Sequence, residues 1–444
     1  MGKVNKMIPS PERLEEYTDR LMKIKERVDK LAEKKIDPIY FEVAGSISPW
    51  LRESKAPWIL ERLFNIDMMR VCLALPDIHR DPSWGRWDHL EATEQFAKDL
   101  SLDKETIDNY LKQMDDANFI VATRKGYQMA RISQTFHGFP GRGAKYFFTL
   151  PEDVQLDIQD LSLVFSRFEL QPPRDEWIDW VKERGVGEQG REFAGFLIMP
   201  RWKSIKDLPG VLPVEDMRQI LKAHEKFSAL RCDCKTEDSG LDCGTPVDVC
   251  MTFDRGAERQ VGRGRGEMLT LKETLDMIDS WRDFPLVHVH MGGVPKTVEE
   301  VQTFCNCHWD CCLAFTGYYT GISKHKISDF LLKTRFRATV DPEECIGCRT
   351  CIDERCQFGA IQMKYYPEFD EERSYTDEEK CMGCGLCVET CCVGARGMKT
   401  VEPPEYILGV DNEVEGIGGG GFAVENLVAT VSRERAEREA KKEK

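Results

Sequence analysis

Eight cysteines near the carboxyl-terminal end repeat one spacing twice: C-x2-C-x2-C followed by a fourth cysteine. Three thiolates at this spacing surround one face of a tight loop, which suits three irons of a cubane, and the fourth cysteine closes the site. Zinc ribbons use paired C-x2-C and rarely place a third cysteine in this way. The spacing therefore predicts two 4Fe-4S clusters. The two sets are Cys345, Cys348, Cys351 and Cys356, and Cys381, Cys384, Cys387 and Cys391.

With these motifs, residues 341–400 resemble a bacterial-type two-cluster ferredoxin domain. The resemblance implies that the fourth cysteine of each motif serves the other cluster. One cluster would then be held by Cys345, Cys348, Cys351 and Cys391, and the other by Cys381, Cys384, Cys387 and Cys356.

The chain departs from the ferredoxin pattern after each motif. Four residues precede Cys356 where three are usual, Gln357 stands in the usual proline position, and Cys392 takes the proline position of the second motif. These changes affect the loop near Cys356 without removing a ligand. An acidic insert between the motifs, KYYPEFDEERSYTDEEK, is suited to selecting a partner.

A second group of cysteines lies in the middle of the chain, and its spacing fits no standard ferredoxin or zinc finger. Soft thiolates in this number favour iron–sulfur clusters or zinc. We expect at least one further 4Fe-4S cluster, with a structural zinc ion as the alternative. His308 is expected beside the ligands or at the surface. The preferred ligands are Cys234, Cys243, Cys250 and Cys307, with Cys232, Cys305, Cys311 and Cys312 as further candidates.

Composition sets the class of protein. The chain has 444 residues, eighteen cysteines and a net charge of −15, which argues against general affinity for nucleic acid or anionic lipid. No apolar run could span a bilayer, and the amino terminus lacks the apolar stretch of a secretory signal. We therefore expect a cytoplasmic protein without membrane insertion, in which clustered thiols bind metal and do not form disulfides.

The order of elements predicts a multidomain α+β protein. Helix, helix and hairpin signals between residues 66 and 132 are typical of a winged helix, with the hairpin turning at Lys125-Gly126. The candidate recognition helix between Asp103 and Asn118 has a charge balance of −3, which is the wrong sign for a DNA groove. The expected parts are a helical arm (1–60), a winged-helix-like domain (61–150), a cysteine-rich α+β module (151–335), the two-cluster ferredoxin domain (336–402), and a glycine hinge with a charged tail (403–444).

Two other segments of the middle module carry expectations. Residues 254–268 contain four arginines among glycines and are expected to form a solvated loop, or alternatively a dock for an acidic partner or a phosphate-bearing cofactor. His288 and His290 alternate on a probable strand, so they share one face. They are expected to be buried strand histidines, with a metal or substrate role as the alternative.

The longer arrangement also resembles multidomain 4Fe-4S binding proteins of anaerobic bacteria and archaea. In these proteins a winged helix precedes a C-x-C…C…P-x-x-x-C segment, a cysteine-crowded CNCC-like segment and a two-cluster ferredoxin. The likeness covers roughly residues 60–400 and rests on CGTPVDVC and CNC; the chain departs from it at His308, Trp309 and Asp310. The resemblance implies electron transfer in anaerobic metabolism.

The leading hypothesis is an iron–sulfur electron-transfer subunit of a cytoplasmic oxidoreductase complex, without catalytic residues of its own. Its partner would be a flavoprotein or a metalloenzyme in a hetero-oligomeric assembly. One alternative is a redox-sensing winged-helix regulator. Another is an oxidoreductase that binds its substrate at an open site of the middle cluster.

Overall fold

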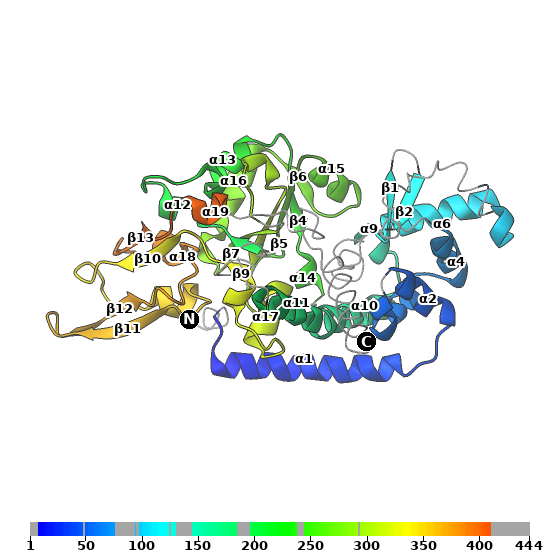
Figure 1. Ribbon diagram of the computed structural model, residues 1–444, viewed down its shortest axis with the longest axis horizontal. Helices are drawn as coiled ribbons and strands as arrows, with labels where there is room; N and C mark the ends of the chain where they lie inside the picture. The colour runs from blue at the N-terminus through cyan, green and yellow to red at the C-terminus, as the bar shows by residue number, and fades with distance from the viewer. Residues whose placement is uncertain are drawn as a thin grey trace, which may run out of the picture.

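The computed structural model describes residues 8–47, 49–75, 94, 97–123, 126–129, 144–183, 196–237, 244–291 and 294–409. Three parts follow one another along the longest axis: N-terminal helices, a sheet module and a C-terminal hairpin region (Figure 1). Mixed helix and strand content confirms the α+β expectation. No helix among the described ranges combines the length and the apolar character needed to cross a bilayer.

The N-terminal part is mainly helical. Ser10 caps the first helix by accepting a hydrogen bond from the Arg13 amide at 3.3 Å. One apolar cluster runs from Val28 to Leu170, so it includes residues on both sides of the boundaries expected after residues 60 and 150. The helices are α1 (Pro11–Ala32), α2 (Pro38–Ile47), α3 (Ala56–Leu63), α4 (Ile66–Ala74), α6 (Lys104–Asp116), α9 (Ala144–Phe147), α10 (Glu152–Val164) and α11 (Gln171–Glu183).

A short antiparallel hairpin follows α6, made of β1 (Ile120–Thr123) and β2 (Gly126–Met129). This confirms the hairpin expected near Lys125-Gly126. The part of the expected winged helix that precedes α6 lies partly outside the described residues, and the winged-helix assignment remains a prediction.

The middle of the molecule is a seven-stranded sheet in the order β6-β4-β5-β8-β7-β3-β9. All neighbouring strands are antiparallel except β3 and β9. The strands are β3 (Phe196–Ile198), β4 (Phe227–Arg231), β5 (Asp248–Phe253), β6 (Glu267–Leu269), β7 (Val287–Met291), β8 (Thr303–Cys307) and β9 (Leu331–Leu332). The helices of this module are α12 (Trp202–Ile205), α13 (Met217–Lys222), α14 (Asp233–Thr236), α15 (Asp254–Gly262), α16 (Leu271–Ser280) and α17 (Leu313–Tyr319).

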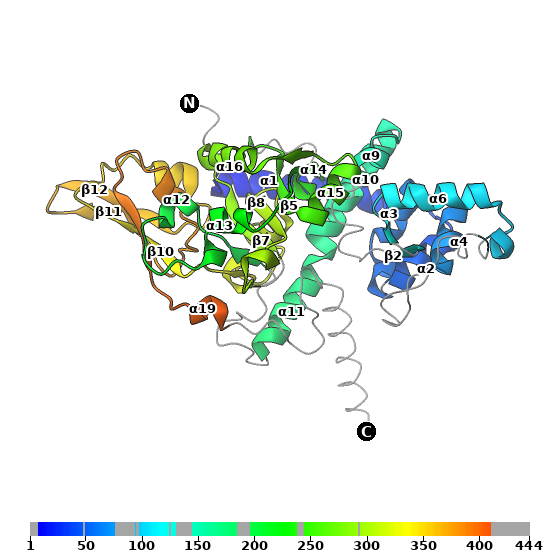
Figure 2. The ribbon, with the colours of Figure 1, turned by 90° about the horizontal axis from the view of Figure 1, so that it is seen from above.

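Helices α10 and α11 run between the N-terminal helices and the sheet module (Figure 2). A π-helical turn, Phe165–Glu169, separates them and is closed by the bond from the Leu170 amide to the Phe165 carbonyl at 2.9 Å. Such an i→i+5 turn rotates the following side chains relative to a regular helix. It directs Arg167 into the protein, where that side chain is fully buried.

The segment rich in arginine and glycine differs from the expected loop, because residues Asp254–Gly262 form α15. Asp254 begins this helix and accepts hydrogen bonds from the Glu225 and Lys226 amides. Arg263, just after the helix, is buried and pairs with Asp115 of α6 at 2.8 Å. One acidic side chain of α6 is therefore used in docking against the sheet module.

The C-terminal part contains two small antiparallel sheets. Arg335 joins it to the sheet module through a buried bidentate pair with Glu215, at 2.9 and 2.7 Å. The β11–β12 hairpin, which contains most of the acidic insert, projects at one end of the molecule in both views (Figures 1 and 2). The elements are β10 (Phe336–Val340), β11 (Ile361–Tyr366), β12 (Glu371–Thr376), α18 (Leu386–Glu389), β13 (Arg396–Thr400) and α19 (Glu405–Leu408).

Candidate metal centres

One centre is a pocket lined by four cysteines from both C-terminal motifs. They are Cys345, Cys348, Cys351 and Cys391, the set that the ferredoxin resemblance implies for one cluster; Cys387 and Cys392 also line the pocket. Burial alone would raise the pKa of Cys345, but hydrogen bonds from Ser374 and the Gly347 amide keep that pKa below its ordinary value. These donors stabilise the thiolate, which is the form that binds iron.

The second C-terminal group consists of Cys356, Cys381, Cys384 and Cys387, whose sulfurs interact electrostatically with one another. Burial raises the pKa of Cys384 to about 12, opposed by the Leu386 amide and by Arg201. Backbone amides of Phe358, Ala360 and Ile361 point to Cys356, where they partly offset the effect of burial on its pKa. The structure thus brings together both crossed sets.

Local backbone geometry explains how the loops form these pockets. Gly383 has a φ of +75°, and a Cβ there would lie 1.9 Å from Thr334 Oγ1, so the position requires glycine. The additional residue before Cys356 is absorbed by a π-helical turn, Cys351–Arg355, in which the Cys356 amide bonds to the Cys351 carbonyl at 3.1 Å. Despite the longer spacing, Cys356 therefore remains beside the cysteines of the second motif.

The middle cysteines converge at one end of the sheet. Cys250 lies on β5, and Cys305 and Cys307 lie on the same face of β8 because alternate strand residues share a face. Strand β5 pairs with β8 through Met251 and Phe304, and continuing this register places Cys250 opposite Cys305. Cys232 is the N-cap residue of α14 and Cys234 lies within that short helix, while the residue before α17 is Cys312.

The six thiols of these residues interact with one another, and we call this group the thiol ring. Cys312 Sγ lies 3.1 Å from Cys307 Sγ. Side-chain hydrogen bonds join Cys312 to Cys234, Cys234 to Cys232, Cys232 to Cys250 and Cys250 to Cys305, and Cys305 interacts electrostatically with Cys307. Contacts with neighbouring thiols and burial raise the pKa of Cys232, and burial raises the pKa of Cys312. Six thiols, of which three belong to buried and three to half-buried cysteines, are more than one four-ligand centre requires.

One buried arginine, Arg174, tests whether this group of thiols fits an anionic metal centre. Burial lowers the pKa of Arg174 to about 10, while the charges of Cys234 and Cys312 act in the opposite direction. Within the described residues, its Nε and Nη2 atoms are buried without a hydrogen-bond partner, although Nη1 donates to the Leu313 carbonyl at 3.0 Å. An uncompensated guanidinium beside thiols is costly unless negative charge is present. The residues fit an iron–sulfur cluster, whose thiolates and sulfides carry that charge.

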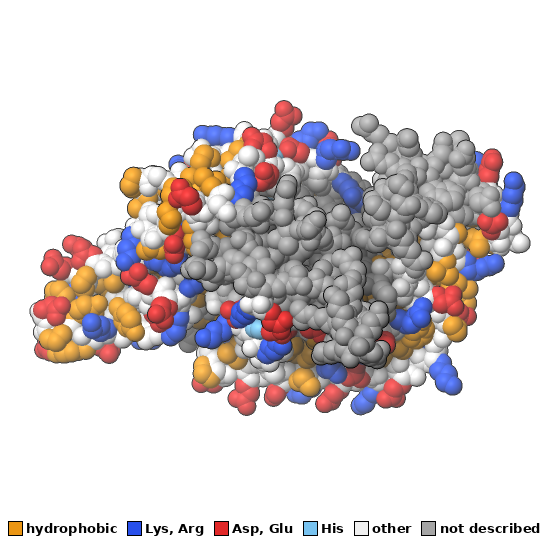
Figure 3. All heavy atoms as spheres, in the orientation of Figure 1, with side chains coloured by type: hydrophobic (Ala, Val, Ile, Leu, Met, Phe, Trp, Pro, Cys, Tyr) orange, Lys and Arg blue, Asp and Glu red, His pale blue; other side chains and the backbone are white. Residues whose placement is uncertain are grey.

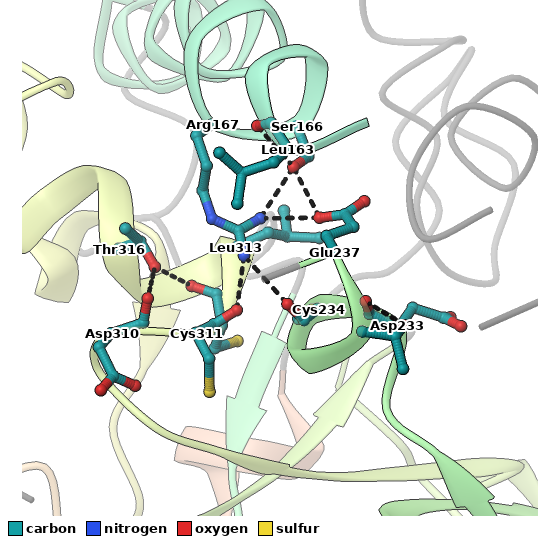
Figure 4. A network of polar contacts seen from close by, with 12 residues as sticks. Leu163, Ser166, Arg167, Asp233, Cys234, Glu237, Asp310, Cys311, Leu313 and Thr316 are labelled. Atoms are coloured by element: carbon teal, nitrogen blue, oxygen red, sulfur yellow. Dashed lines mark hydrogen bonds and ion pairs between the residues drawn. The ribbon is translucent and has the colours of Figure 1, made fainter. Parts of the chain in front are cut away.

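Arg167 fixes the loops that bear the thiols (Figure 4). Its guanidinium pairs with Glu237 at 3.1 Å and donates to Ser166 at 2.8 Å. It also donates to the carbonyls of Cys234, at 3.3 Å, and Cys311, at 2.6 Å. Two cysteine-bearing segments more than seventy residues apart are thereby held by one side chain.

The preferred middle ligands are only partly described. Cys234, Cys250 and Cys307 belong to the thiol ring, whereas Cys243 lies outside the described residues. Cys311 lies beside the His308 and Asp310 side chains. His308 is fully buried, which rules out the surface position that was one of its two expected locations.

His288 and His290 are buried on β7, as expected for strand histidines. Asn306 Nδ2 donates to the Val249 carbonyl at 2.6 Å, so its Oδ1 faces His288 Nδ1 at 2.5 Å and accepts a hydrogen bond from it. His288 Nε2 then accepts from Arg201 Nη1 at 2.9 Å. Burial and the charge of Arg201 hold the pKa of His288 well below its ordinary value, so the ring is neutral. Both nitrogens are used, which leaves neither for a metal.

Sequence reasoning missed two residues that join the ferredoxin region to the thiol ring. Gln357 is fully buried, and its side-chain amide donates to the carbonyls of Pro285 and Cys307. The Arg201 amide donates to the Cys384 carbonyl at 2.9 Å. A glutamine in the position of the usual proline was the available signal for Gln357, but nothing in the sequence marks Arg201.

The comparison with known families is limited to the C-terminal part. Residues 344–395 match the family described as a 4Fe-4S dicluster domain. No curated protein and no solved structure matches the chain. With both cysteine motifs inside this match, the chain carries a C-terminal ferredoxin-type iron–sulfur domain, which indicates iron–sulfur electron transfer.

Proposed function

We propose that the protein is an electron-transfer subunit of an oxidoreductase complex, in which the ferredoxin region connects an external redox partner to a third 4Fe-4S cluster in the thiol ring. The ligands of the two C-terminal clusters are the crossed sets described above. The observation that carries this proposal is one buried contact. Gln357, which directly follows Cys356, donates a hydrogen bond to the carbonyl of Cys307 on β8. When bound, 4Fe-4S clusters accept and release single electrons.

Two chains of hydrogen bonds support this junction. In the first, Gln357 follows Cys356 directly and donates to the Cys307 carbonyl at 3.2 Å, while Tyr319 donates to the Gln357 carbonyl at 2.6 Å. In the second, the bonds run from the Cys384 carbonyl to Arg201, His288 and Asn306. The side chains of Gln357, Arg201, His288 and Asn306 are buried, and these bonds hold the two sets of cysteines in a fixed position relative to each other.

The opposite side of the ferredoxin region is suited to contact another protein. Cys348 and Cys392 are exposed, and the neighbouring Ile346 and Val393 are 60% and 40% exposed. Hydrophobic and charged side chains lie together over the β11–β12 end of the surface (Figure 3). Exposed acidic residues of this end, Glu343, Glu344, Asp370 and Glu372, favour a partner with a basic rim.

The class of redox partner follows from the number of electrons that each group transfers in one step. A flavoprotein or metalloenzyme can exchange single electrons with a cluster and perform two-electron chemistry on a substrate. The described residues favour this role over a substrate site beside His288, because that imidazole is neutral and hydrogen-bonded at both nitrogens.

The test is anaerobic purification of the full chain with iron and sulfide analysis and an EPR-monitored redox titration. About twelve irons and three reducible centres are expected, with potentials near the lower end of the roughly −700 to +450 mV range of such clusters. About eight irons would remove the third cluster from the proposal. Potentials well above zero would contradict low-potential electron transfer.

A Gln357→Leu variant tests the junction, with Gln362→Leu on the exposed side of β11 as the matched control. The Gln357 variant is expected to keep about twelve irons but to slow reduction of the thiol-ring centre after rapid mixing with a low-potential donor. Unchanged kinetics, read by freeze-quench EPR, would exclude a role for this contact.

The regulator hypothesis is kept as a competing outcome because α6 and the β1–β2 hairpin stand in the expected order. Asp115 of α6 is engaged by Arg263, and the helix is acidic, which disfavours approach to phosphates. Sequence-specific binding in a gel-shift assay, present in only one of the apo and holo forms, would establish the regulator instead.

A further inference from the structure

The turn between β8 and α17 brings three different ligand types together. His308 Nδ1 lies 2.5 Å from Asp310 Oδ1. Ligand atoms of His308, Asp310 and Cys311 all lie within 4.8 Å of one another. The three residues are 0%, 2% and 2% exposed. A thiol, an imidazole and a carboxylate thus share one dry site.

The backbone of this turn is fixed on both sides. The Cys312 amide donates to the His308 carbonyl at 3.1 Å. The Thr316 hydroxyl is 2.9 Å from the Cys312 carbonyl, its shortest contact, and 3.3 and 3.2 Å from the carbonyls of Trp309 and Asp310. Arg167 donates to the Cys311 carbonyl at 2.6 Å (Figure 4). The backbone of the turn is therefore held before any ion binds, and the contact between His308 Nδ1 and Asp310 Oδ1 must lengthen if both atoms are to lie at about 2.0–2.2 Å from one zinc ion.

This group is distinct in composition from the thiol ring. Cys312 contacts Cys307 and Cys234 and so belongs to the ring. Its neighbour Cys311 has its sulfur 4.0 Å from the His308 carbonyl and within reach of the His308 and Asp310 ligand atoms. Adjacent residues at the start of a helix project in different directions, so Cys311 lies with His308 and Asp310 while Cys312 lies with the thiol ring.

We propose that His308, Asp310 and Cys311 bind one Zn²⁺ ion. Zinc accepts imidazole nitrogen, thiolate sulfur and carboxylate oxygen together, whereas Mg²⁺ and Ca²⁺ prefer oxygen alone. A divalent cation balances the two negative charges of a buried carboxylate and a bound thiolate. The second carboxylate oxygen of Asp310 or a water molecule completes the usual four positions. The ion would lock the turn that bears Cys307 and Cys312, and its presence does not depend on the proposed electron-transfer function.

The test is zinc analysis and zinc-edge X-ray absorption on the full-length protein, purified anaerobically, supplied with Zn²⁺ and washed with a chelator. One tightly held zinc per chain is expected, with one sulfur neighbour at about 2.3 Å and nitrogen or oxygen neighbours at about 2.0–2.2 Å. Absence of retained zinc would overturn the proposal. Zinc with four sulfur neighbours would also overturn it, because that signature belongs to the thiol ring.

Variants identify the ligands. Cys311→Ser is expected to remove the sulfur neighbour. Asp310→Asn is expected to weaken zinc binding by at least roughly ten- to hundredfold, which is the loss seen when a residue that only hydrogen-bonds to a metal ligand is removed. Cys72→Ser, a buried cysteine that contacts Met114 far from the turn, is the matched control and should keep the ion. If either ligand variant folds with wild-type zinc affinity and spectrum, the assignment is wrong. If both fail to fold, the spectrum of the wild-type protein decides alone.

Discussion

Replacing Arg167 should destabilise the protein strongly, because its guanidinium neutralises a carboxylate inside the protein. Arg167 and Glu237 are both fully buried and paired at 3.1 Å. Arg167→Met leaves the Glu237 charge without that cation, and breaking a buried pair from one side costs about 3–5 kcal/mol in the free energy of unfolding. For a cooperative unit of about 150–250 residues, this lowers Tm by about 6–20 °C.

The assay is anaerobic thermal unfolding followed by circular dichroism, with iron content measured in parallel. Arg349→Met is the matched control, because its pair with Asp353 has side chains that are 51% and 43% exposed. An exposed pair contributes at most about 1 kcal/mol, so this control should unfold close to the wild-type temperature. Iron in the thiol ring should fall only in the Arg167 variant, since that side chain also holds the Cys234 and Cys311 carbonyls.

The double variant Arg167→Met, Glu237→Met separates the buried charge from lost packing. Removing both members of a buried pair is often nearly neutral, so most of the stability should return. Equal Tm values for the Arg167 and Arg349 variants would refute the reasoning. A double variant less stable than Arg167→Met alone would refute it as well.

Two other predictions concern a glycine and a histidine. Gly383→Ala should lower the free energy of unfolding and the iron content more than Gly394→Ala does. Both glycines have positive φ, but only at Gly383 would a Cβ meet atoms, at 1.9 Å, and strain alone costs about 1–2 kcal/mol; equal losses in denaturant unfolding would contradict this. Burial lowers the pKa of His288 in the folded state. Below pH 6.5 the unfolded chain therefore binds a proton at this residue that the folded chain does not. The free energy of unfolding falls as the pH decreases for this reason. His288→Gln should reduce this slope by up to about 1.4 kcal/mol per pH unit between pH 6.5 and 5.5, and identical slopes in anaerobic unfolding would rule the explanation out.

The ferredoxin cysteines were the most predictable part of the chain because their geometry is local. Within each C-x2-C-x2-C stretch the loop itself sets the positions of three sulfurs, and glycines such as Gly383 provide the necessary positive φ. The expected extra residue before Cys356 could be counted in the sequence. The π-helical turn that accommodates this residue could not be predicted, because it depends on the contact of Gln357 with the Cys307 carbonyl in another part of the fold.

The thiol ring was predictable in its members but not in its arrangement. Cys250 and Cys305 are brought together by strand register over more than fifty residues, and register depends on the whole sheet. Arg167 was missed for a related reason, since an arginine in a helical segment normally reaches solvent. Residues 254–262 were expected to form a loop because of their glycine content, yet they form a helix that begins at Asp254. Arg263 follows the end of this helix and pairs with Asp115.

The packing of α1 against Trp309 constrains the order in which the protein matures. Tyr17 meets the Trp309 ring at 5.8 Å, and Leu21 and Leu163 complete a small apolar cluster over the turn that bears His308 and Cys311. These partners are nearly three hundred residues apart, so α1 is synthesised early but can dock only after the turn exists. Because α1 covers Trp309 in that turn, a metal ion bound there as proposed would exchange with solvent more slowly while α1 is docked than when α1 is released.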